Sequence, residues 1–227
     1  MRGVEPIIFE RARAEERVKM ALSTAEGPVM MTTSFGIQAA VLLHLMSRHK
    51  PGIEVVFIDT GFLFPETYEF ARHLEARLDI TLRTYKPAMG PNEIVDTYGE
   101  MWNYGEVGLE RYNEIVKVEP MQRALSEIKP QLWFAGLRRK QSQGRKMKAG
   151  FERLEHLWKV YPIIDWTDRH IYKYLKKHDL PYHPLWEKGY LSVGDYHSSA
   201  PLKAGGAVEN TRFKGVKREC GLHDRLT

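Results

Sequence analysis

Cysteine is almost absent from this chain, which contains only Cys220 among 227 residues. A single thiol forms no disulfide within the chain. It also cannot supply the several thiolates that an iron–sulfur cluster or a cysteine-rich zinc site requires. We therefore expect no iron–sulfur cluster and no metal ion as cofactor.

Long apolar runs are also absent. No stretch approaches the ~20 residues that span a bilayer. The charged segment at residues 1–17 lacks the apolar core of a signal peptide. The sequence therefore predicts a cytoplasmic protein with no membrane partner.

The net charge of +5 favours an anionic partner. Much of the excess positive charge lies in two short segments, residues 138–148 and 214–218. A duplex-binding protein would more often carry a basic helix face or stripe. We therefore expect a small anion as ligand and no nucleic acid.

Short apolar runs alternate with helical patterns along most of the chain. The predicted strands lie at residues 28–33, 54–58, 80–85, 132–135 and 158–164. The predicted helices lie at residues 9–25, from 37 to the Pro-Gly pair at 51–52, from 65 to 78, at 119–128 and at 167–178. This alternation predicts an α/β fold with a mainly parallel sheet and helices on both faces.

The alternation ends near residue 180. We expect residues 1–180 to form a nucleotide-binding domain, and residues 181–227 to form a mobile C-terminal lid or tail that carries Cys220. Ligands of such sheets bind beyond the carboxyl ends of the strands.

Two polar turns follow the first two predicted strands. Ser34, Phe35 and Gly36 join a strand to a helix, where backbone N–H groups can bind an anion; an ordinary turn is the alternative. Asp59, Thr60 and Gly61 follow the second strand. Asp59 is suited either to accept from a ribose hydroxyl or to cap a helix.

Basic residues follow the fourth predicted strand. Arg138 and Arg139 open a run that has six positive charges and no acid between residues 136 and 148. Such a run is most often a solvated loop. Its place at a strand end favours phosphate binding instead, for which the arginine fork is well suited.

Cys220 lies in a polar, glycine-flanked segment close to Lys217, Arg218 and His223. Nearby cations favour the thiolate, which is the nucleophilic form. A buried structural cysteine would normally lie in an apolar strand or helix, so this context favours a reactive thiol.

Taken together, six ordered segments resemble the phosphoadenylyl-sulfate (PAPS) reductase family of assimilatory sulfate reduction. The most specific is Lys-Arg-Glu-Cys-Gly-Leu-His at residues 217–223. The others lie at residues 34–36, 59–67, 117–120, 136–142 and 192–197.

The resemblance implies an adenine-nucleotide α-hydrolase-like fold, a homodimer, and thioredoxin or glutaredoxin as electron donor. It implies that Cys220 attacks the sulfur of PAPS and that the tail closes over the nucleotide. The side chains that it assigns to the sulfo and phosphate groups are Lys117, Arg138, Arg139, Arg212 and His223. We expect Ser34, Phe35, Gly36, Asp59, Thr60 and Gly61 to complete the substrate site.

Three alternatives differ from this prediction. Adenylyl-sulfate (APS) reductases usually carry additional cysteines for a cluster, so their cluster-free members are the nearest alternative. ATP-splitting adenylyltransferases carry a Ser-Gly-Gly-x-Asp-Ser loop, of which residues 34–39 lack the second Gly and the Asp. A non-catalytic nucleotide- or RNA-binding protein gives no reason for Cys220 in such a segment.

Overall fold

The computed structural model describes residues 1–212, apart from residues 2, 204 and 206–210. A six-stranded sheet has the order β3–β2–β1–β4–β6–β5. Its strands are β1 (Val29–Thr33), β2 (Ile53–Ile58), β3 (Ile80–Tyr85), β4 (Leu132–Ala135), β5 (Phe151–Leu154) and β6 (Leu157–Val160). All neighbours are parallel except β5 and β6. The predicted α/β fold with a mainly parallel sheet is confirmed.

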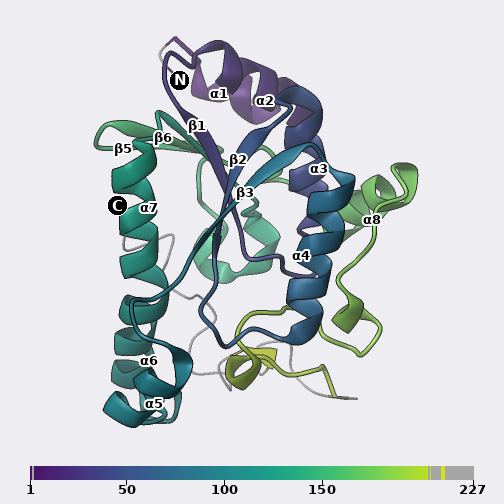
Figure 1. Cartoon of the computed structure of the whole chain (residues 1–227). Helices are drawn as coiled ribbons and strands as arrows, with labels where there is room; N and C mark the ends of the chain where they lie inside the picture. Colours follow the sequence, from purple (N-terminus) through teal and green to yellow (C-terminus); the bar gives the residue numbers. More distant parts are fainter. Residues whose placement is uncertain (2, 204, 206–210, 213–227) are drawn as a thin grey trace.

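The sheet buries apolar side chains on both faces, because successive residues of a strand point to opposite sides. Met31 and Phe134 pack under one group of helices, whereas Met30 and Trp133 pack on the other side against α7 (Glu119–Ile128). The first group comprises α1 (Pro6–Arg11), α2 (Ala14–Ser23), α3 (Ala40–His49), α4 (Pro65–Arg77) and α8 (Asp168–Lys177). Figure 1 shows the sheet between these two layers.

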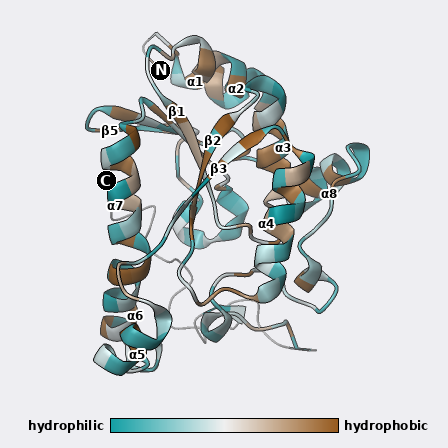
Figure 2. Cartoon of the chain, viewed as in Figure 1, coloured by the Kyte–Doolittle hydropathy of each residue, from teal (hydrophilic) through white to brown (hydrophobic). Residues whose placement is uncertain are grey.

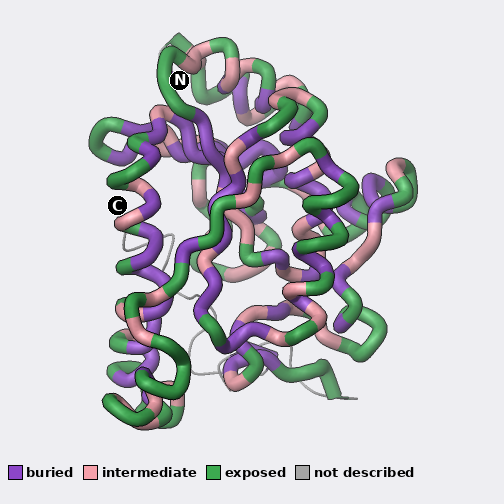
Figure 3. Tube along the Cα trace, in the orientation of Figure 1, coloured by how far each residue is buried: buried purple, intermediate pink, exposed green. Residues whose placement is uncertain are grey.

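The apolar side chains are concentrated at the centre of this arrangement. Hydrophobic residues colour the central strands and the inward sides of the helices (Figure 2). The same strands are mostly buried along their length, while the outer turns of the helices are exposed (Figure 3). The edge strand β3 is less buried than β1, β2 and β4.

A helical arm precedes β4, and only its last part was predicted. It comprises α5 (Pro91–Tyr98), the 3₁₀ turn η1 (Met101–Asn103), α6 (Gly105–Asn113), the π-helical turn η2 (Glu114–Val118) and α7. The arm has a small core of its own around Phe62, Ile94 and Tyr112. Gly99 and Gly105 have positive φ angles and divide the arm into short pieces.

Several predicted boundaries need correction. The single helix expected at residues 9–25 is two helices, because Ala12 and Arg13 are extended. Arg13 is the N-cap residue of α2, and its backbone N–H donates to the Glu16 carboxylate. The second predicted helix starts at Ala40, after a turn rather than at residue 37. The strand expected at residues 158–164 ends at Val160, and its antiparallel partner β5 was not predicted.

The described part of the predicted tail packs against the α/β body. Leu185 and Val193 are buried against Ile37, which follows β1. The segment contains the 3₁₀ turns η5 (Pro184–Trp186) and η6 (Tyr196–Ser198). The boundary at residue 180 stays a prediction. Among the described helices, none combines the length and the apolar character needed to cross a membrane.

Candidate functional site

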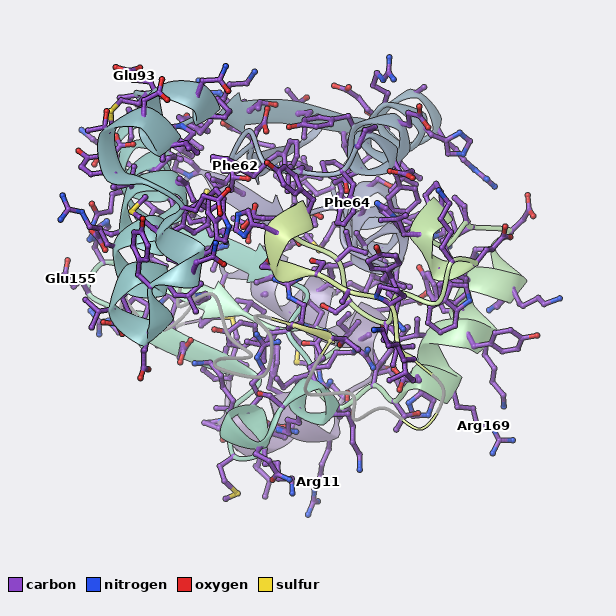
Figure 4. The ribbon with its side chains drawn as sticks, turned by 90° about the horizontal axis from the view of Figure 1, so that it is seen from below. Arg11, Phe62, Phe64, Glu93, Glu155 and Arg169 are labelled. Atoms are coloured by element: carbon purple, nitrogen blue, oxygen red, sulfur yellow. The ribbon has the colours of Figure 1, made fainter. Side chains whose placement is uncertain are left out.

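The carboxyl ends of β1, β2 and β4 form the edge on which the predicted loops gather. β1 lies between β2 and β4, with both of which it pairs in parallel. The order of strands reverses at β1, since β2 and β3 lie on one side and β4 on the other. Such a switch point opens a crevice between the outgoing loops. The loops at residues 34–36, 59–61 and 136–139 are therefore neighbours, and Figure 4 views the molecule from this side.

The loop after β1 is held by Phe35. Its ring is fully buried and packs edge-on against Phe57, with 5.0 Å between centroids. Its φ angle of 47° is uncommon for an aromatic residue. Ser34 is exposed beside it, and the α-carbon of Gly36 faces the backbone oxygen of Val193. Phe35 thus anchors a turn that presents the Ser34 hydroxyl at the crevice.

The loop after β2 is built around the carboxylate of Asp59. Its Oδ1 accepts hydrogen bonds from the Tyr68 hydroxyl at 2.6 Å and from the Gly61 backbone N–H at 3.0 Å. The Lys86 ammonium lies 3.4 Å from Oδ2. Burial, with the hydrogen bond to Asp59, raises the pKa of Tyr68 above its usual value.

A cavity of about 360 Å³ opens at this loop. Asp59, Thr60, Gly61, Tyr68, Lys86, Pro87, Met89, Gly90 and Pro91 line it. Gly61 has a φ angle of 78°, and a Cβ atom there would lie 2.4 Å from the Pro91 ring. The cavity therefore depends on glycine at this position.

Lys117 reaches the same edge from the π-helical turn η2. Its ammonium donates to Asp195 Oδ2 at 2.6 Å and to Asn113 Oδ1 at 2.9 Å. The other oxygen of Asp195 accepts from the Thr60 hydroxyl at 2.5 Å. Single π turns are frequent at functional sites, and this one brings Lys117 to the loop after β2.

An aromatic cluster surrounds this ion pair. The rings of Trp102 and His197 are stacked 3.9 Å apart, and His197 Nε2 is hydrogen-bonded to the Tyr112 hydroxyl at 3.0 Å. Phe62, labelled beside η6 in Figure 4, contacts both Trp102 and His197. Burial, followed by the charge of Asp195, raises the pKa of Tyr112 well above its usual value. The pair therefore lies in apolar surroundings.

Arg138 and Arg139 point to different neighbours. Arg138 is buried, donates to Gln38 Oε1 at 2.5 Å, and lies 3.0 Å from Asp168 Oδ1. It is thus held beside the turn that leads into α3. The Nη2 of Arg139 donates to both carboxylate oxygens of Glu10 in α1. Whether either side chain contacts substrate stays a prediction.

Arg212 is the last residue that the structure describes, and it packs against the segment at residues 194–199. It forms an antiparallel bridge with Ser199, and its Nη1 donates to Ser199 Oγ at 3.3 Å. A Cβ atom on Gly194 would lie 2.6 Å from both terminal guanidinium nitrogens. The guanidinium therefore rests directly on Gly194.

Cys220 and His223 lie outside the described residues. Seven residues lie between Arg212 and Cys220 in the sequence, so their α-carbons are eight residue spacings apart and at most roughly 28 Å from each other. Their predicted roles are untested. Asp195, Gly194 and Asn113 were assigned no role from the sequence, although residues 192–197 were recognised as a motif. Within the described part of the chain, no group of three or more His, Cys, Asp or Glu residues is arranged to hold a metal ion.

Known proteins match the chain along most of its length. The family model described as "Phosphoadenosine phosphosulfate reductase domain" matches residues 28–201. A "Phosphoadenosine 5'-phosphosulfate reductase" of Salmonella newport (strain SL254) is 51% identical over 216 residues, which covers 95% of this chain and 88% of the relative.

Solved structures agree with this match. The crystal structure of a phosphoadenylyl-sulfate (PAPS) reductase from Candida auris, in a phosphate complex, aligns with a TM-score of 0.73 at 30% identity and covers 86% of this chain and 94% of that one. A Candida glabrata FMN adenylyltransferase in complex with ATP aligns with a TM-score of 0.60 at 16% identity, covering 83% and 62%. The second likeness shows a shared fold alone, and the predicted adenine-nucleotide α-hydrolase-like fold is confirmed.

Proposed function

The chain belongs to the phosphoadenosine phosphosulfate reductase family, and from that membership we propose that it reduces PAPS to sulfite and adenosine 3′,5′-bisphosphate. The observation that carries the proposal is the placement of Lys117 and Arg212. Lys117 is bound to Asp195, which accepts from Thr60 in the loop after β2. Arg212 rests on Gly194, the residue before Asp195. The loops that follow the strands are where a doubly wound sheet binds a nucleotide, and where an anionic sulfo-phosphate group needs positive charge.

We assign the two ends of the substrate to two parts of the crevice. The cavity beside Asp59 and Thr60 is suited to the nucleoside, since it is concave and carries both apolar and polar groups. The sulfo and phosphate groups then extend toward Ser34, Lys117 and Arg212. In this proposed orientation the reacting sulfur lies toward Arg212, the last described residue before Cys220 in the sequence.

The chemistry proposed for Cys220 is nucleophilic. Its thiolate attacks the sulfur atom, the bond between sulfur and the bridging phosphate oxygen breaks, and adenosine 3′,5′-bisphosphate leaves with that electron pair. The leaving group is already a stable anion. Catalysis therefore depends on alignment and charge neutralisation more than on proton donation. The product on the protein is a cysteine S-sulfonate.

A dithiol protein completes the cycle. One thiolate of thioredoxin or glutaredoxin attacks the Cys220 sulfur and releases sulfite, which leaves a mixed disulfide. The second thiol of the donor resolves it, so the donor is oxidised by two electrons and Cys220 is regenerated. A single cysteine suffices because the partner brings two more. We place this reaction in cytoplasmic sulfate assimilation, catalysed by a homodimer without an iron–sulfur cluster.

Paired turnover assays test this function. With thioredoxin as donor, PAPS should give sulfite at one equivalent per disulfide formed, and at higher kcat/KM than APS. Equal or better use of APS would assign the chain to the cluster-free APS reductases. ATP–pyrophosphate exchange without sulfite formation would instead support an adenylyltransferase.

A further inference from the structure

Two consecutive residues, Gly194 and Asp195, hold cations from distant parts of the chain. Asp195 Oδ2 accepts from the Lys117 ammonium at 2.6 Å. Gly194 supports the guanidinium of Arg212, because a Cβ atom there would lie 2.6 Å from Nη1 and Nη2. The positions of both cations therefore depend on the same two-residue segment, Gly194 and Asp195, which we call the 194–195 step.

The 194–195 step is tied to the crevice on one side. Asp195 forms an antiparallel bridge with Leu63, and the next residue donates its backbone N–H to the Phe62 oxygen at 2.8 Å. Its carboxylate accepts from the Thr60 hydroxyl. Asp195 is therefore fixed to the loop after β2 by both backbone and side chain.

On the other side, the step is tied to the residues that lead into the C-terminal segment. The Gly194 backbone N–H donates to Ser199 Oγ at 3.0 Å, and Ser199 bridges Arg212. The Ala200 N–H donates to the Thr211 oxygen at 3.0 Å. Residues 211–212 are thus connected through Ser199 and Ala200 to the step that holds Lys117.

Asp195 keeps its charge although it is only 1% exposed. Burial acts to raise its pKa, but the Lys117 ammonium and the Thr60 hydroxyl outweigh burial and hold the pKa below its usual value. The other polar groups of this environment are Asn113, which binds Lys117, and the hydrogen-bonded pair of Tyr112 and His197. Lys117 and Asp195 are neutral as a pair, so the carboxylate reduces the attraction that Lys117 exerts on an anion.

We propose that the 194–195 step positions Lys117 and Arg212 as one unit against the sulfo-phosphate group of the substrate, with Asp195 as a positioning residue. The inference rests on the proposed function, which supplies the anion. A carboxylate beside an anion site weakens binding of the anionic substrate in the ground state. It can favour catalysis only by aligning the reacting groups. Its removal should therefore lower the rate while affinity for the anion is unchanged or becomes tighter.

The first test is Asp195→Asn, which preserves shape and removes the charge. The dissociation constant for adenosine 3′,5′-bisphosphate, measured by calorimetry, should stay within twofold or become tighter, while kcat with PAPS falls at least tenfold. Glu54→Gln is the matched control. It breaks the 2.6 Å ion pair with Arg83, near the amino end of β2, and changes net charge equally. The control should leave both quantities within twofold of wild type.

The second test is Gly194→Ala, which forces the guanidinium of Arg212 to move. We expect kcat/KM for PAPS to fall at least tenfold. Gly27→Ala is its control, because Gly27 precedes the amino end of β1 and a Cβ atom there meets only the Gln131 side chain, at 3.4 Å. When Gly194→Ala is combined with Asp195→Asn, the loss should be smaller than the product of the two single losses, because both act on one unit.

The outcomes separate this inference from the proposed function. If wild type reduces PAPS while Asp195→Asn keeps its kcat, or loses kcat and product affinity in parallel, Asp195 does not position Lys117 for catalysis. Independent, multiplicative effects of the two substitutions would contradict a single unit. Absence of PAPS reduction by wild type would overturn the proposed function itself. Gly194→Ala keeps the inference testable if Asp195→Asn fails to fold.

Discussion

At the scale of residues, carboxylates partner three of the cations that the sequence assigned to the substrate. Lys117 is paired with Asp195, Arg138 with Asp168, and Arg139 with Glu10. Each pair fixes a long flexible side chain, so less conformational entropy is lost when a ligand binds. Each of these three cations is therefore already held by a carboxylate of the protein.

His183 gives a pH-dependent stability that can be measured. Its Nδ1 accepts from the Leu185 N–H, and its Nε2 is hydrogen-bonded to Thr67. Burial lowers its pKa from 6.5 to about 4. The unfolded chain therefore binds a proton below about pH 6.5 that the folded chain does not, and stability falls as the pH drops toward 4. The full shift corresponds to about 3 kcal/mol.

Chemical denaturation of His183→Gln at pH 7 and pH 5 measures this effect. The variant should be less stable than wild type at pH 7 and should lose less stability on acidification. His156→Gln changes an exposed histidine and should keep the slope of wild type. An unchanged slope in His183→Gln would show that this histidine is not the source.

The sequence revealed the site residues that directly follow strands, but not the side chains that bind and fix the site residues. Ser34, Asp59 and Arg138 were found because a strand end is visible as the end of an apolar run. Asp195 is separated by 78 residues from Lys117 and by 135 from Thr60. Nothing in the local pattern reveals such a partner, so only its motif was recognised.

At the scale of elements, the buried strands were predictable and the helical arm was not. Three predicted strands, at residues 80–85, 132–135 and 54–58, agree with β3, β4 and nearly all of β2. The runs of β2 and β4 are mainly apolar, because both faces of an inner parallel strand are covered, whereas the edge strand β3 alternates apolar and polar residues. The arm before α7 consists of short helices separated by glycine turns. Its few core residues therefore form no long stretch of helical hydrophobic periodicity in the sequence.

The π turn η2 makes a prediction at this scale. Deleting Glu114 should convert the turn to a regular α-helix and displace Lys117 from Asp195, while α6 and α7 keep their own packing faces. We expect sulfite formation to fall by at least a hundredfold with little change in far-ultraviolet circular dichroism. Glu114→Ala, which keeps the extra residue, should retain activity. Full activity in the deletion variant would show that the turn does not place Lys117.

At the scale of the whole molecule, the excess of positive charge should favour PAPS over APS, which lacks one phosphate. We propose the basic run at residues 138–148 as the contact of this additional phosphate. Lys148 is paired with Glu152, and Arg145 donates to Gln141, whereas Lys146 is exposed. A charge-assisted hydrogen bond contributes about 1.5–3 kcal/mol, which is roughly 10- to 150-fold in affinity.

Lys146→Gln should therefore lower kcat/KM for PAPS about tenfold and leave that for APS within twofold. The salt dependence of PAPS use should be the steeper of the two in wild type. Lys177→Gln, an exposed lysine on α8, removes the same charge and should affect neither substrate. Equal losses with both substrates would place the 3′-phosphate elsewhere in the crevice.

The central claim is that Cys220 carries the sulfo group between substrate and thiol donor. Mass spectrometry of the intact protein, incubated with PAPS and no reductant, tests it most directly. We predict that wild type gains the mass of one SO₃ group, that peptide analysis places it on Cys220, and that thioredoxin removes it with release of sulfite. Cys220→Ser should bind adenosine 3′,5′-bisphosphate and gain no mass. Sulfite formation by Cys220→Ser, or turnover of wild type without the adduct, would contradict the account.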